Sequence, residues 1–154
     1  MMKWLFKGMM KFIFLLFMLP ITCFAADPLE GIWKTIDDRT GYSRADVKIQ
    51  KKADGSYEGF IVETRSLPGT EKLHICTLCP GNAQNKPFAG LTILWNLTQD
   101  RKDPFKYESG QILDPLNGKI YSGYAKLSGT GNRLTIRGYT HGSAIGRSVT
   151  WIKY

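Results

Sequence analysis

The sequence predicts an all-β protein: a single eight-stranded antiparallel up-and-down β-barrel that follows a cleaved signal peptide. After the leader, runs of about five to eight β-forming residues recur between turn signals, and no amphipathic helical stripe appears. The first run opens with Gly31-Ile32-Trp33, and the last contains Arg147 and Trp151. The first and last strands become neighbours when a barrel closes, so a guanidinium can lie across an indole. We therefore expect Arg147 to cover Trp33 at the floor of the barrel.

The N-terminal segment 1–25 has the composition of a secretory signal. Three lysines precede an apolar run at 12–24, and the small residues Cys23 and Ala25 occupy the positions that a signal peptidase reads. The apolar run is short for a permanent membrane anchor. A lipoprotein anchored through Cys23 is the other alternative. We expect cleavage after Ala25, which leaves one domain at 26–154 with no stable membrane insertion.

Charge and size narrow the functional classes. The formal net charge is +8, and the leader contributes three lysines and no acids, so the exported chain carries +5. Its cations are scattered along the sequence, which favours a solvated basic surface with at most weak attraction to anionic membranes. Export also argues against nucleic-acid binding. The remaining 129 residues suffice for one core without stabilisation by a metal or a disulfide. We also expect no cofactor.

The predicted strands follow one another with short connections. Turn signals stand at Ala53–Ser56, Asp114–Gly118 and Ser128–Asn132, whereas Ser66–Gly90 is long enough to be functional or to contain a short helix. Apolar residues alternate with polar ones at 45–50 and at 91–98, which is typical of antiparallel strands with one face in the core. The eight runs are Ile32–Ile36, Ala45–Lys51, Tyr57–Arg65, Leu91–Thr98, Tyr107–Leu113, Lys119–Leu127, Arg133–Tyr139 and Arg147–Tyr154.

Several phrases carry a family resemblance across the whole exported chain. They begin with Gly31–Asp38 and Cys76–Gly81, and continue through Gly90–Leu94, Gly110–Lys119 and the segment from Arg137 to Trp151. In this order they resemble a bacterial exported family known as domain of unknown function 2147. The resemblance implies a lipocalin-like (calycin-like) barrel in the bacterial periplasm. It implies no established activity.

Cys76 and Cys79 are the cysteines that remain after export, in a C-x-x-C spacing near His74. A local disulfide that stiffens the long loop is the first reading, because an oxidising compartment permits it. A thiol-redox site is the second, although the βαβ frame usual for such motifs is missing. The third is a metal site with His74, but this supplies three ligands where structural zinc takes four. We predict the disulfide and no metal.

Aromatic and basic residues on different strands are candidates for lining a ligand lumen, since an apolar pocket with a few polar tips is typical of small-molecule sites. An arginine that points inward can meet a ligand carboxylate or phosphate. A structural role competes for each residue, as a floor seal for Trp33 with Arg147 and as plain core for Trp95. The candidates are Trp33, Trp95, Tyr121, Arg137, Tyr139 and Arg147.

Catalytic candidates are weak. The adjacent carboxylates of Asp37 and Asp38 suit acid–base work, but Asp before Arg39-Thr40-Gly41 is also ordinary turn chemistry, which we favour. His141 has no nucleophile partner suggested by the sequence and is expected to face solvent. We therefore expect that the protein is not an enzyme.

The leading functional hypothesis is a periplasmic protein that binds a small apolar or amphipathic ligand. The alternatives are an envelope interaction module that docks an unknown protein through Ser66–Gly90, and a thiol-redox or metal role at the cysteine pair.

Overall fold

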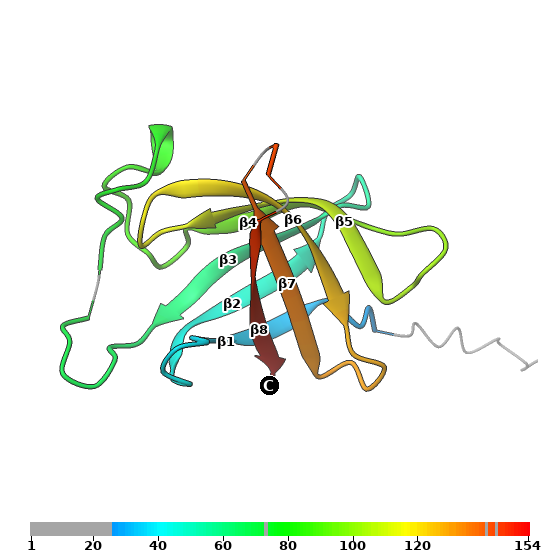
Figure 1. Cartoon of the computed structure of the whole chain (residues 1–154), viewed down its shortest axis with the longest axis horizontal. Coiled ribbons are helices and arrows are strands. Elements are labelled where there is room, and N and C mark those ends of the chain that lie inside the picture. The colour runs from blue at the N-terminus through cyan, green and yellow to red at the C-terminus, as the bar shows by residue number, and fades with distance from the viewer. Residues whose placement is uncertain (1–25, 73, 141, 144) are drawn as a thin grey trace, which may run out of the picture.

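In the computed structural model, eight antiparallel strands close into one barrel (Figure 1). Each strand pairs with the next along the chain, and the last strand pairs with the first. The structure describes residues 26–72, 74–140, 142–143 and 145–154. The strands are β1 Gly31–Ile36, β2 Ser43–Lys51, β3 Tyr57–Thr64, β4 Thr92–Gln99, β5 Lys106–Asp114, β6 Lys119–Leu127, β7 Arg133–Tyr139 and β8 Gly146–Lys153.

The predicted fold class and all eight predicted strands are confirmed, with ends that shift by one or two residues. β2, for example, begins at Ser43 rather than Ala45. The predicted signal peptide at 1–25 and His141 lie outside the described residues. Within the described part of the chain, no helix is both long and apolar enough to cross a bilayer.

The barrel is packed at one end and open at the other. At the packed end, large side chains with almost no solvent exposure fill the interior and leave little space. This end holds Leu29, Trp33, Tyr57, Leu97, Tyr107, Leu127 and Leu134. Toward the other end the inward residues are smaller, and a cavity remains.

The pairing of β1 with β8 differs from the expected contact between Arg147 and Trp33 at the barrel floor. In the antiparallel register Trp33 lies opposite Lys153, and Ile36 lies opposite Thr150. The start of β8 therefore meets the end of β1, so Arg147 lies far from Trp33. Instead, the Lys153 ammonium is 5.3 Å from the centre of the Trp33 ring. The prediction that Arg147 covers Trp33 is wrong, because it was based on the residue types alone and did not include the register between β1 and β8.

A break in strand β4 moves Trp95 out of the core face. Asn96 has a φ of 58°, and the pairing of β3 with β4 shifts register there. Leu94 and Leu97 are fully buried, whereas Trp95 is half-buried and its Nε1 donates a hydrogen bond to Gln111. The simple alternation predicted for this strand is therefore wrong at Trp95.

The long connection after β3 contains the short 3₁₀ helix η1, Gly81–Ala83. Figure 1 shows this loop projecting from the barrel at the end where the β5–β6 turn also lies. An isolated β-bridge pairs Ile75 with Pro87, and Phe88 is buried against the core. The loop is thus anchored to the barrel where it returns to it, through Phe88.

Candidate functional site: a cavity at the open end of the barrel

A cavity of about 800 Å³ occupies the open half of the barrel. This volume lies within the usual range for small-molecule sites. Its inner wall is apolar and comes from several strands, and the buried Trp151 is part of this wall. The wall includes Ile61, Ile93, Ile112, Ile136 and Val149.

A glycine on β7 contributes to the cavity. Gly138 lines it, and a Cβ at this position would stand 3.3 Å from Cβ of Tyr121 and 3.8 Å from Cδ1 of Ile112. A larger residue here would press on Tyr121 and reduce the open space. The Tyr121 hydroxyl accepts a hydrogen bond of 3.0 Å from Asn117, which also donates to Asp114. Tyr121 therefore offers an apolar ring with a polar tip near the rim.

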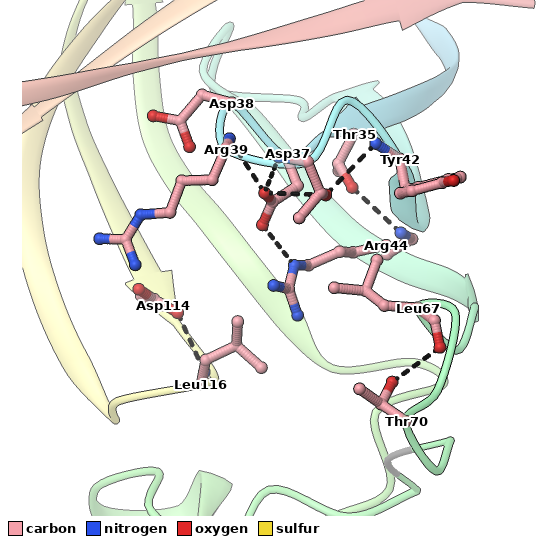
Figure 2. A network of polar contacts seen from close by, with 12 residues as sticks. Thr35, Asp37, Asp38, Arg39, Tyr42, Arg44, Leu67, Thr70, Asp114 and Leu116 are labelled. Atoms are coloured by element: carbon pink, nitrogen blue, oxygen red, sulfur yellow. Dashed lines mark hydrogen bonds and ion pairs between the residues drawn. The ribbon is translucent and has the colours of Figure 1, made fainter.

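The rim carries an ion pair between Asp37 and Arg44 (Figure 2). Arg44 Nε lies 2.6 Å from Asp37 Oδ2, and the other carboxylate oxygen accepts backbone N–H bonds from Arg39 and Thr40. The hydrogen bond from Arg44 holds the pKa of Asp37 far below its usual range, although desolvation opposes the shift. The predicted turn role of Asp37 is confirmed. Its ion pair with Arg44 was not predicted from the sequence.

A second pair joins the β1–β2 turn to the start of β8. Arg147 Nε donates to Asp38 Oδ2 at 3.0 Å, and its Nη2 also contacts that carboxylate. The hydrogen bond with Arg147 lowers the pKa of Asp38. Both side chains are about half exposed, so water screens the attraction. Both acids of the predicted carboxylate pair are thus held as ionised partners of arginines, which does not suit either for proton donation.

A third arginine at the rim is anchored to the outer wall. Arg65 donates from both terminal nitrogens to Asp46, at 2.6 and 2.5 Å. The Tyr154 hydroxyl also bonds to Asp46, and Arg65 donates to Tyr154. This network links the end of β3 to the C-terminal residue. Nothing in the local sequence around Arg65 indicates a partner 19 residues away, so only the fold reveals it.

The predicted lumen residues divide into two groups. Tyr121, Tyr139 and Arg147 line the cavity. Trp33 lies in the packed floor, where its Nε1 donates to the Leu29 carbonyl, and Trp95 lies outside the cavity. Arg137 lies on a shallow second hollow and its guanidinium is 3.5 Å from the Ser148 hydroxyl. Trp33, Trp95 and Arg137 are therefore not cavity-lining residues.

The floor contains one buried polar group without a partner. The Tyr57 and Tyr107 rings meet edge to face with centroids 5.4 Å apart. The Tyr57 hydroxyl donates to Asp27 at 2.6 Å, whereas the Tyr107 hydroxyl has no hydrogen-bond partner among the described residues. Burial raises the pKa of Tyr107 to about 12, so this phenol stays neutral.

The predicted disulfide is present between Cys76 and Cys79, whose Cα atoms are 5.4 Å apart. Both cysteines are buried, and Cys76 Sγ lies 3.3 Å from the Pro115 carbonyl oxygen. A disulfide leaves no thiolate for a metal. The disulfide loop also rests on the β5–β6 turn, since a Cβ at Gly118 would stand 1.8 Å from the Leu78 carbonyl oxygen. The cysteine pair thus supports the turn that forms part of the cavity rim.

Comparison with known proteins agrees with this architecture. The family model described as "Uncharacterized protein conserved in bacteria (DUF2147)" matches residues 31–153. A solved structure reported as "Protein HP1028 from the human pathogen Helicobacter pylori belongs to the lipocalin family" superposes with a TM-score of 0.66, at 20% identity over 82% of each chain. No curated protein matches the chain. At this identity the structural likeness shows a lipocalin-like fold and nothing finer.

Proposed function

Since the chain belongs to the DUF2147 family and folds as a lipocalin-like barrel, we propose that it binds one small apolar or amphipathic molecule in its cavity. The observation that carries the proposal is the cavity of about 800 Å³, apolar inside and charged at its rim. An amphipathic ligand fits this polarity with its apolar part inside and its polar group at the mouth. The Tyr121 hydroxyl and Arg147 lie where that polar group would be.

The proposal describes a binding protein rather than an enzyme. Asp37 and Asp38 are held ionised by Arg44 and Arg147, and these pairs support a structural role at the rim. We further propose that the protein works in the periplasm. The disulfide at Cys76 favours an oxidising compartment, in line with the expected export signal.

A fluorescence titration tests the binding proposal. N-phenyl-1-naphthylamine, an uncharged dye that brightens in apolar surroundings, is added to the purified protein and displaced with n-alkanols. Each added methylene should tighten the alkanol by about fourfold until the cavity is full, because burial of one CH₂ contributes about 0.8 kcal/mol.

Two matched variants locate the site. Val149→Trp places an indole in the cavity, which takes up part of its volume, and should weaken dye binding. Val62→Trp adds the same side chain to the exposed outer face of β3 and should leave the signal unchanged. Thermal unfolding of both variants confirms that each is folded. Equal dye binding by the wild type and Val149→Trp would place any ligand outside the barrel and contradict the proposal.

A further inference from the structure

We propose that the open end of the barrel docks on an anionic lipid bilayer, so that an amphipathic ligand passes directly between the membrane surface and the cavity. The docking surface consists of four apolar residues on three connections, which we call the apolar rim. They are Ile75, Leu78, Leu116 and Ile145.

All four residues of the apolar rim are exposed, two of them strongly. Ile145 is 85% exposed and Leu78 is 62% exposed, and Ile75 and Leu116 are each nearly half exposed. Single exposed apolar residues are common, but several on converging loops mark an interaction site. Two of the four, Leu116 and Ile145, also line the cavity. These two residues therefore connect the apolar rim with the ligand site.

The part of the rim formed by the long loop is held rigid. Besides the disulfide, the Cys76 N–H donates to the Lys86 carbonyl at 2.9 Å, and the Asn85 N–H donates to the Cys76 carbonyl at 2.8 Å. The Leu78 backbone packs against Gly118 of the β5–β6 turn. This bracing presents Leu78 without the entropic cost of ordering a loose loop on binding.

The charges around the rim select an anionic partner. From Lys72 to Gln99 the sequence contains no acidic residue. Lys72, Lys86 and Lys119 are exposed, and none of them forms an ion pair within the described part of the chain. The rim acids Asp37 and Asp38 are already neutralised by arginines.

Three acids at this end, Glu63, Glu71 and Asp114, have no ion-pair partner among the described residues, and neither does the cation Arg39. The unpaired cations, Arg39 and the three lysines, therefore outnumber the unpaired acids. Exposed apolar residues flanked by lysines match the chemistry of an anionic membrane surface, with acyl chains below and phosphates above.

Vesicle flotation tests this inference. The full exported chain is mixed with vesicles of phosphatidylglycerol or of phosphatidylcholine, and the bound fraction is measured at low and physiological salt. We expect binding to phosphatidylglycerol that weakens with salt, and little binding to phosphatidylcholine. Absence of binding to phosphatidylglycerol would overturn the inference and favour a protein partner for this surface. Equal binding to both lipids would overturn the anionic selectivity.

Charge-reversal variants distinguish the contribution of the rim lysines to membrane binding from that of lysines elsewhere on the surface. Lys86→Glu with Lys119→Glu should weaken binding to phosphatidylglycerol by tenfold or more, because one lysine contributes about fivefold near an anionic surface. The matched control, Lys48→Glu with Lys102→Glu, reverses two exposed lysines that lie away from the rim and form no ion pair among the described residues, and it should change binding much less. An equal loss in both pairs would show that net charge, not the rim, governs binding.

Apolar substitutions complete the test. Ile75→Ser with Leu78→Ser removes two exposed rim residues that do not line the cavity, whereas Val62→Ser with Ile152→Ser removes two comparably exposed residues of the outer wall. The first pair should lose vesicle binding while it retains dye binding in the cavity. Vesicle binding retained by Ile75→Ser with Leu78→Ser would overturn the role of the rim. Vesicle binding by a wild type that binds no dye would overturn the proposed function alone.

Discussion

Lys153 and Trp33 form the contact that closes the barrel floor, with the ammonium 5.3 Å from the centre of the indole ring. They lie directly opposite each other at the seam where β8 meets β1. The same ammonium donates to the Pro28 carbonyl at 2.7 Å, so one side chain joins the last strand to the segment before the first. The indole in turn donates to the Leu29 carbonyl. The floor is therefore fastened by residues from both ends of the described chain.

The floor contact predicts an order of stability effects for two cationic residues of β8. Lys153→Gln should lower the free energy of unfolding by about 1 kcal/mol, because it removes a cation–π contact and a hydrogen bond. Arg147→Gln should lower it by less than about 0.5 kcal/mol, because its pair with Asp38 is half exposed. Urea denaturation measures both. A larger loss for Arg147→Gln would contradict the assignment of the floor to Lys153.

The ion pair at Asp37 predicts a pH-dependent contribution to stability. The pKa of Asp37 is lower in the folded protein than its ordinary value of 3.8, so folding favours the ionised form. This contribution is complete above about pH 5 and is lost progressively as the pH falls through 3.8 toward the lowered pKa. Asp37→Asn should therefore cost about 1 kcal/mol at pH 7 and progressively less below pH 4. A cost that stays constant from pH 7 to pH 2.5 would contradict the ion-pair account.

Two glycines with similar backbone conformations test the docking of the disulfide loop. Gly118 has a φ of +70° and packs against the Leu78 carbonyl, whereas Gly55 has a φ of +83° with open space around it. Alanine at either position is strained by about 1 kcal/mol. Gly118→Ala should cost roughly 1–3 kcal/mol more, because the loop must also move away. Equal costs in thermal unfolding would show that the loop does not rest on this turn.

Removal of the disulfide should weaken the loop more than the barrel. The bond closes a very short loop, so Cys76→Ser with Cys79→Ser should lower the free energy of unfolding by about 2 kcal/mol. Amide hydrogen exchange should accelerate at 74–90 while the strands keep their protection. Loss of protection in β1 and β8 would mean instead that the disulfide supports the whole fold.

The strands were predictable because their signals are local. Turn residues such as Asp54-Gly55 and Asn117-Gly118 mark the hairpins, and alternation marks the buried face of β2. Alternation failed at Trp95, because Asn96 adopts a left-handed conformation that interrupts the strand. Asparagine tolerates that conformation but does not require it, so the break was not visible beforehand.

The partners at the cavity rim were less predictable, because they depend on register and on contacts between distant residues. Tyr121, Tyr139 and Arg147 were identified as lining residues by type and strand position. The pairing of Arg147 with Asp38 spans 109 residues and follows only once β8 is placed beside β1. The apolar wall was missed as a site because aliphatic residues at strand positions look the same whether a barrel is filled or hollow.

Native mass spectrometry of the protein purified from the cells that produce it detects whether the open half of the barrel holds a small molecule. We expect a native mass above the mass of the denatured chain, with a smaller excess in Val149→Trp, whose indole occupies part of the cavity. A wild-type native mass equal to that of the chain alone, or the same excess in Val149→Trp, would contradict the proposed function.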